Sequence, residues 1–236
     1  MEFLYYYWMT QRYYIFLILP TLIFAGWAQN KVSSTFRHYS KVMSHSGMTA
    51  AEICRKLLDA NGLYQIRIER IGGNLTDHYD PSSNVIRLSE SVHDSLSVAA
   101  IGVAAHETGH AIQYAVGYKP IHLRAAIIPL TNFGSKISIP MLAVGFVSQW
   151  RPLIGIGILL FSTATLFQLV TLPVELDASS RALDTLDKNG LLVGEELGQA
   201  KKVLTAAAMT YVAALLTSAA ELLRLVLIYG RNRDRD

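Results

Sequence analysis

The sequence contains a single cysteine, Cys54, among its 236 residues. A lone cysteine excludes an intrachain disulfide and a zinc site built from several thiolates. Charged residues are also few, 17% of the chain, and the formal net charge of +3 is too small to predict binding to nucleic acid. Apolar residues, by contrast, make up 51% of the chain and are unevenly spread. This composition predicts an integral membrane protein.

Four apolar runs have about the length that a helix needs to cross the hydrocarbon of a bilayer. The first is short, but aromatic residues flank it, as is typical of a membrane anchor. The second and third are separated by only a few residues and predict a transmembrane hairpin. The runs are 13–28, 125–147, 152–172 and 203–223. We therefore expect a mainly α fold with about four transmembrane helices.

The most informative motif is His106-Glu107-Thr-Gly-His110. Small apolar residues precede it, with Asp94 or Ser95 available as an N-cap, which predicts a helix through the motif. Residues four apart share one face of a helix, so His106 and His110 can bind one metal ion while Glu107 stays free. The run 95–116 is long enough to span a membrane, but these three ionisable side chains would be costly in lipid, so we place it in the water-facing part.

The segment before the motif has the pattern of a small water-facing domain. A capping box at Thr49 to Glu52 begins a helix that ends at Asn61 and Gly62, and the apolar period then changes from helical to alternating. Three short strands are expected, at Tyr64–Glu69, Asn74–Tyr79 and Val85–Leu88. We predict Val85–Leu88 as an exposed sheet edge that adds an extended peptide, or alternatively as a strand that only packs the domain.

A catalytic zinc site typically has three protein ligands and an open position for water. The carboxylates where the third apolar run ends, Glu175 and Asp177, are the candidates for the third ligand. They point to different helix faces, about 200° apart, so only one of them is expected to bind the metal. The alternative is that either carboxylate is simply favoured by the helix dipole after Pro173.

Several separated motifs resemble the bacterial neutral zinc metallopeptidases of the YugP type. They are the N-terminal anchor, Asp77-His-Tyr-Asp-Pro81, the run from His106 to Gln113, and Leu172-Pro-Val-Glu-Leu-Asp-Ala-Ser179. More distantly, their order is similar to that of the membrane gluzincins, which implies a small α+β, zincin-like domain and Glu175 as the third ligand, with Ala178 in register. Ser179 stands where the gluzincin pattern has an aspartate that contacts a histidine ligand, so that contact must be supplied differently.

These residues predict a membrane-embedded zinc metallopeptidase. Zn²⁺ is expected on His106, His110 and Glu175, with Glu107 as the general base and with His78 or Arg181 as the donor that stabilises the oxyanion. Gln113 could orient a ligand, but we expect it mainly to pack. The alternatives are a metal-binding scaffold or chaperone-like protein without turnover, and a metal transporter. Transport would favour ionisable ligands in several spans, whereas Glu221 and Arg224, possible partners at i and i+3, lie near the end of the last one.

The expected partners are a peptide or membrane-protein substrate and the lipid bilayer, without nucleic acid. Five basic residues flank the spans on one side and nine on the side that holds the motif, so the positive-inside rule predicts a site facing the cytoplasm of a bacterial cell. The sequence does not predict the oligomeric state. The predicted organisation is an anchor at 1–30, a water-facing domain with the motif helix at 31–124, the hairpin at 125–172, a helix with the third ligand at 173–202, and a span with a basic tail at 203–236.

Overall fold

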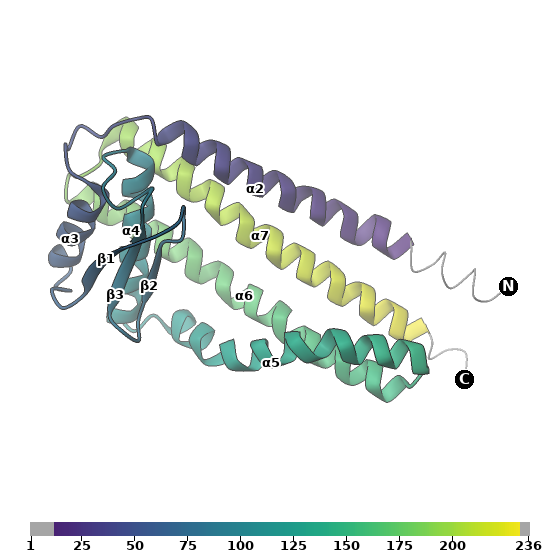
Figure 1. Ribbon diagram of the computed structural model, residues 1–236. Coiled ribbons are helices and arrows are strands. Elements are labelled where there is room, and N and C mark those ends of the chain that lie inside the picture. Colours follow the sequence, from purple (N-terminus) through teal and green to yellow (C-terminus); the bar gives the residue numbers. More distant parts are fainter. Residues whose placement is uncertain (1–11, 232–236) are drawn as a thin grey trace. The chain divides into compact units, whose positions relative to one another are not determined.

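The computed structural model describes residues 12–231, so the aromatic residues at 5–8 and the basic tail after residue 231 lie outside the described residues. Long helices dominate the described chain, and three short strands lie between the third and fourth helical segments (Figure 1). The elements are η1 (Tyr14–Ile18), α2 (Leu19–Tyr39), α3 (Ala50–Ala60), β1 (Arg67–Ile71), β2 (His78–Asp80), β3 (Val85–Ser89), α4 (Val98–Ala115), α5 (Lys119–Ser148), α6 (Arg151–Lys188) and α7 (Gly194–Arg231).

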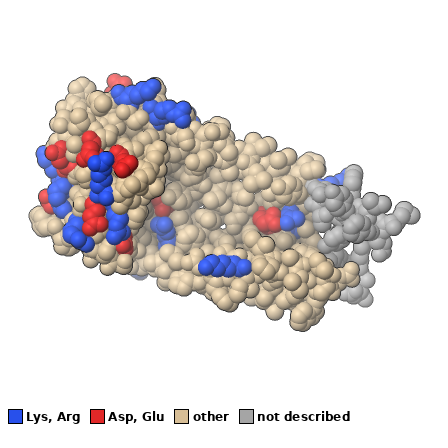
Figure 2. All heavy atoms as spheres, in the orientation of Figure 1, with Lys and Arg blue, Asp and Glu red and all other residues tan. Residues whose placement is uncertain are grey.

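Four helical segments are long and apolar enough to cross a membrane: Tyr14–Tyr39, Lys119–Ser148, Arg151–Lys188 and Gly194–Gly230. This confirms the predicted mainly α membrane protein. Helix α4, which carries the motif, is not among these segments. Charged side chains are distributed in the same way as polarity along the chain. In Figure 2 acidic and basic side chains gather over the part that contains the strands and are sparse along the long helices.

The chain forms two compact units, one from the described parts of 1–28, 123–172 and 210–236, and the other from 29–122 and 173–209. In the first unit, small residues let α5 and α6 approach closely. A Cβ on Gly134 would lie 2.8 Å from the carbonyl oxygen of Leu160, and one on Gly145 would lie 2.8 Å from the side chain of Ile154. In α7 of this unit, Arg224 Nε donates to Glu221 Oε2 at 2.9 Å, as the spacing suggested. Both charges therefore have a partner inside the span.

The second unit has a core built on α3 and α4. The predicted capping box is present, since Thr49 accepts from the backbone of Glu52 and Glu52 accepts from that of Thr49. Helix α4 begins later than predicted: its N-cap is Ser97, not Asp94 or Ser95. The reason is that the backbone N–H of Ala50 donates to the carbonyl of Ser95, which ties the segment before α4 to the start of α3.

The sheet corrects the predicted edge strand. Its order is β1-β3-β2, with β3 parallel to β1 and antiparallel to β2. The prediction that Val85–Leu88 is an exposed edge is therefore wrong, because β3 is the central strand. Val85, Ile86, Leu88 and Ser89 are all buried, and burial on successive residues indicates that both faces of the strand are covered. The free edges of this sheet belong to β1 and β2.

The first two strands are also displaced from the expected ranges. The strand predicted at Tyr64–Glu69 lies at Arg67–Ile71, because Leu63 and Ile66 are buried in the core as part of the turn that follows α3. The strand predicted at Asn74–Tyr79 is reduced to His78–Asp80. Leu75 has a φ of 55°, which a β-strand does not accommodate, so the chain turns there before pairing with β3.

Candidate metal centre

Three side chains of the second unit converge on one point. His106 Nε2 lies 3.2 Å from Glu175 Oε2, and His110 Nε2 lies 3.5 Å from the same oxygen. The ligand atoms of the three residues all lie within 4.8 Å of one another. Two ligands at about 2.0–2.1 Å on a tetrahedral zinc ion lie about 3.4 Å apart, so the two distances match a shared zinc ion. The donor set of two imidazoles and one carboxylate also suits zinc.

The two helices that carry these residues approach very closely. His106 and His110 lie one turn apart on α4, and Glu175 lies on α6, which continues without interruption through Pro173. Gly109 makes the approach possible, because a Cβ at that position would lie only 2.3 Å from the carbonyl oxygen of Ala178. A residue without a side chain is therefore required beside His110.

Each histidine has a second contact through its other ring nitrogen. His106 Nδ1 lies 3.1 Å from Ser179 Oγ, and His110 Nδ1 lies 3.0 Å from Gln113 Oε1. Ser179 therefore provides the contact that the gluzincin pattern assigns to an aspartate. Such contacts hold an imidazole in orientation and leave Nε2 directed at the metal position.

Asp177, the other candidate for the third ligand, lies in a different set of contacts. Its Oδ2 accepts from Gln113 Nε2 at 2.7 Å and from Arg181 Nε at 2.6 Å. The guanidinium group of Arg181 also lies over the ring of Tyr118, 5.6 Å from its centre. Among the described residues, the cluster of metal-ligating groups contains Glu175 and does not contain Asp177.

Glu107 is 7% exposed and is held by a backbone group of the neighbouring sheet. Its Oε2 accepts from the backbone N–H of Tyr79 at 2.9 Å, and the ring of Tyr79 packs edge-on against that of Tyr114 in α4. Strand β2 pairs with β3 on one side only, so the N–H of Tyr79 points outward from the sheet. Glu107 therefore lies between His106 and His110 in the sequence, and its carboxylate lies beside the free edge of β2 in the folded protein.

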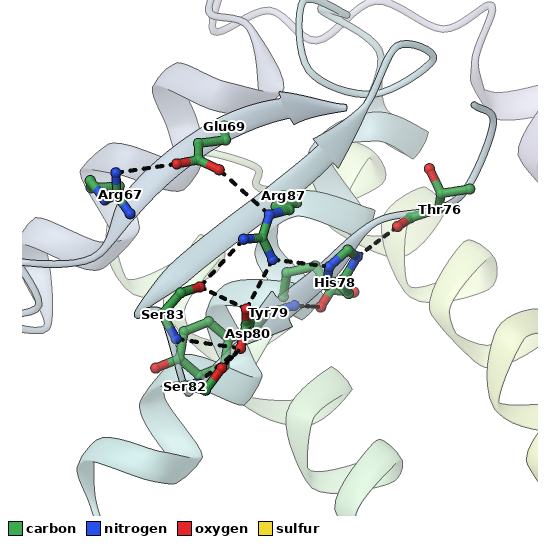
Figure 3. A network of polar contacts seen from close by, with 10 residues as sticks. Arg67, Glu69, Thr76, His78, Tyr79, Asp80, Ser82, Ser83 and Arg87 are labelled. Atoms are coloured by element: carbon green, nitrogen blue, oxygen red, sulfur yellow. Dashed lines mark hydrogen bonds and ion pairs between the residues drawn. The ribbon is translucent and has the colours of Figure 1, made fainter. Parts of the chain in front are cut away.

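Two aspartates hold β2 at its ends, and Figure 3 shows the contacts of one of them, Asp80. Asp77 accepts from the backbone N–H and the hydroxyl of Ser89, at 2.7 and 3.0 Å. Asp80 accepts from the hydroxyls of Ser82 and Ser83 and from Arg87. These hydrogen bonds, with that of Ser82 the strongest and that of Arg87 the weakest, hold the pKa of the Asp80 carboxyl well below its usual range. The segment from Asp77 to Asp80 is therefore fixed where it presents the Tyr79 N–H to Glu107.

His78, one of the two candidates for the oxyanion donor, belongs to this network. Its Nδ1 lies 2.9 Å from the carbonyl of Thr76, and its Nε2 lies 3.5 Å from a guanidinium nitrogen of Arg87 (Figure 3). Side chains alternate along a strand, so His78 and Tyr79 point to opposite faces of the sheet. Tyr79 packs against α4, and His78 therefore lies on the face directed away from that helix.

His110 of α4 and Cys54 of α3 have shifted pKa values. Burial alone would lower the pKa of His110, but its hydrogen bond with Glu175 and the negative charges of Glu107 and Glu175 outweigh burial, and the pKa is raised. The site thus favours positive charge, as expected where a cation binds. Burial raises the pKa of the Cys54 thiol to about 12. That thiol lies 3.3 Å from the hydroxyl of Thr108, on the side of α4 that packs against α3.

Sequence reasoning missed one contact of this candidate site and gave too little weight to another. The donor to Glu107 is a backbone N–H, which no side-chain motif can reveal. The contact of Gln113 with His110 corrects the expectation that Gln113 mainly packs. The signal for it was present, since residues at i and i+3 on a helix are neighbours, and a buried amide must have hydrogen-bond partners.

The chain matches known proteins over nearly its whole length. Residues 14–230 match the model of the family described as "Putative neutral zinc metallopeptidase". A curated relative, "Putative membrane protease YugP" of Bacillus subtilis (strain 168), is 48% identical over 223 residues, which cover 94% of this chain and 99% of that protein. No solved structure is significantly similar to this chain. Together with the convergence of its two motif histidines and Glu175, these matches identify the chain as a member of the neutral zinc metallopeptidase family, and as a membrane protein.

Proposed function

We propose that this protein is a membrane-embedded zinc endopeptidase whose metal ligands are His106, His110 and Glu175. One observation carries the proposal: the Nε2 atoms of His106 and His110 lie 3.2 and 3.5 Å from Glu175 Oε2, close to the spacing of ligands on a shared zinc ion, and a buried carboxylate, Glu107, stands within the same motif. A purely structural zinc site has four protein ligands and no need of such a carboxylate. Among the described residues, this site offers three ligands, which leaves a position for water.

Glu107 is the general base in this proposal. Zinc, when bound, lowers the pKa of a coordinated water towards about 7 and polarises the peptide carbonyl. Glu107 takes the proton of the attacking water and returns it to the leaving amine. The Tyr79 N–H holds Oε2 of Glu107, so the remaining carboxylate oxygen is the one that accepts the proton. Ser179 and Gln113 keep the imidazoles in orientation during these steps.

We propose that the substrate is a peptide or a segment of a membrane protein that binds in extended form along β2. The support is that β2, unlike β3, has a free edge, and that this edge adjoins Glu107. An extended chain can add to a sheet edge through backbone hydrogen bonds, which places its carbonyl groups in a row beside the site.

Arg181 is the better candidate for the oxyanion donor. The hydrogen bonds of His78 lie on the sheet face directed away from α4. Arg181 lies on α6 with Glu175, and only its Nε is used in the hydrogen bond with Asp177. Its terminal nitrogens are therefore available to a developing negative charge. We expect Arg181→Met to lower kcat more than His78→Asn does, and equal losses would argue against this assignment.

We also propose that the protein resides in a bacterial cell membrane with its site facing the cytoplasm. The support is the excess of basic residues near the span ends on the side that carries the motif. Substrates would then be cytoplasmic peptides or the cytoplasmic segments of membrane proteins.

The experiment that tests the function is Glu107→Gln in full-length protein purified in detergent. Cleavage of an unstructured protein substrate and bound zinc are measured on the same samples. We expect wild-type protein to cleave and the variant to lose at least about 10²-fold in rate while keeping its zinc, since general-base catalysis contributes about 10²–10⁴-fold. Cleavage by the variant at the wild-type rate would refute the role of Glu107. If both proteins bound zinc and neither cleaved the substrate, the alternative function of a metal-binding scaffold without turnover would be favoured.

A further inference from the structure

We propose that Gln113 is a positioning residue that fixes the tautomer of His110 and so prepares its Nε2 for the metal. This inference rests on the proposed function, because it concerns the same ligands. Gln113 is completely buried, at 0% exposure, and every polar atom of its amide has a partner. The sequence leaves its role open between orienting a ligand and packing.

The orientation of the Gln113 amide follows from its partners. Its Nε2 lies 2.8 Å from the carbonyl oxygen of Val174 and 2.7 Å from Asp177 Oδ2. A carbonyl and a carboxylate only accept hydrogen bonds, so the NH₂ end of the amide must face them. The reverse orientation would bring oxygen against two oxygens. The carbonyl oxygen Oε1 is therefore the end that faces His110.

This orientation determines the proton on the imidazole. His110 Nδ1 lies 3.0 Å from Oε1, which can only accept, so Nδ1 must carry the hydrogen. In the neutral ring Nε2 is then the nitrogen with the lone pair, and in the protonated ring Nε2 carries the second hydrogen, which faces Glu175 Oε2, 3.5 Å away. Loss of the Nε2 proton therefore leaves His110 directly in the tautomer that can bind a metal, with no change of tautomer needed.

Gln113 is in turn held by an ion pair on the other helix. Asp177 Oδ2 also accepts from Arg181 Nε at 2.6 Å, so the carboxylate keeps its charge and its position. Two of the contacts of Gln113 are on α6 and one is on α4, and the amide therefore links His110 to the helix that carries Glu175. By comparison, Ser179 can both donate and accept, so its contact with His106 does not select a tautomer.

The test compares Gln113→Leu with a matched control, Thr108→Val, in full-length protein. Both replace a buried polar side chain of α4 with an apolar one of similar size, but the partners of Thr108 are Cys54 and the carbonyl of Ala104, not a ligand. Zinc affinity is measured by competition with a chromogenic chelator, and the visible spectrum is recorded with Co²⁺ in place of zinc. We expect Gln113→Leu to weaken zinc binding by about 10–100-fold and to change the Co²⁺ bands, with neither effect in the control.

The outcomes separate this inference from the proposed function. Wild-type affinity and an unchanged Co²⁺ spectrum in Gln113→Leu would overturn the positioning role while leaving the zinc site intact. If wild-type protein bound no metal, the proposed function and this inference would both fail. Should Gln113→Leu not fold, Gln113→Asn keeps the amide but is one methylene too short, and it should also bind zinc more weakly. Equal affinity in Gln113→Asn and wild type would likewise overturn the role.

Discussion

Substitution of Gly109 by alanine should separate the two helices that carry the proposed metal ligands. The new Cβ would lie 2.3 Å from the carbonyl oxygen of Ala178, whereas a carbon and an oxygen without a bond between them approach to about 3.3 Å. The backbones must therefore move apart by about 1 Å. Ala178 lies one turn after Glu175 on α6, so the displacement is transmitted directly to that ligand. Metal-ligand distances tolerate only about 0.2 Å.

We expect Gly109→Ala to weaken metal binding more than it destabilises the folded protein. Overpacking of this kind destabilises by about 1–3 kcal/mol, and the better helix propensity of alanine offsets about 1 kcal/mol of that. The folded protein should therefore survive in detergent. Zinc affinity should fall by at least about 10-fold and cleavage by about 10²-fold, as is typical when a site is misplaced by about 1 Å.

Gly102→Ala is the matched control for this substitution. Gly102 lies in the same helix, and its added Cβ would meet Ala200 at 3.4 Å, an ordinary contact. We expect unchanged zinc affinity and a stability gain of up to about 1 kcal/mol. Both variants are assayed by chelator competition, thermal unfolding and substrate cleavage. Wild-type zinc affinity and cleavage in Gly109→Ala would refute the close approach of α4 and α6.

Three further predictions concern the contact of Tyr79 with Glu107, the burial of Cys54 and the side of the membrane that Lys188 faces. Tyr79→Pro removes the N–H that holds Glu107, whereas Tyr79→Ala removes only the side chain. The proline variant should therefore cleave at least about 10-fold more slowly than the alanine variant, with the same amount of bound zinc. Equal cleavage rates would show that the N–H is dispensable. Because burial raises the pKa of Cys54 to about 12, its thiol stays protonated at pH 8. It should therefore react with iodoacetamide only after denaturation, which mass spectrometry can measure. Rapid labelling of the native protein would contradict the burial of this thiol. A single cysteine at the exposed Lys188, in a Cys54→Ala background, should react with an impermeant maleimide only after cells are opened, and labelling of intact cells would place the site outside.

Much of the geometry of this candidate site could be predicted from the sequence, because two of its side chains lie at helical spacing. The period of an α-helix was enough to predict that His106 and His110 share one face. Length and apolarity were enough to predict the four candidate membrane spans. The choice of Glu175 needed the family pattern, since helix geometry allowed Asp177 equally. The structure favours Glu175, because Asp177 is engaged by Gln113 and Arg181.

The features that could not be predicted depend on contacts between distant segments. Strand β3 was expected at an edge because its sequence does not show which strands lie on either side of it, and the parallel pairing with β1 is set by the path of the chain between them. The Tyr79 N–H is a backbone group, and its contact with Glu107 depends on where β2 lies against α4. Pro173 indicated a helix start, yet α6 continues through it and carries Glu175 into the second unit.

The most direct test of the zinc site is the metal content of the purified full-length protein and of two variants, Glu175→Ala and Asp177→Ala. After removal of loosely bound metal by gel filtration, we predict one zinc ion per chain in wild type and in Asp177→Ala, and little or none in Glu175→Ala. Elemental analysis gives these values without any knowledge of the substrate. Zinc retained by Glu175→Ala and lost from Asp177→Ala would contradict the proposed centre.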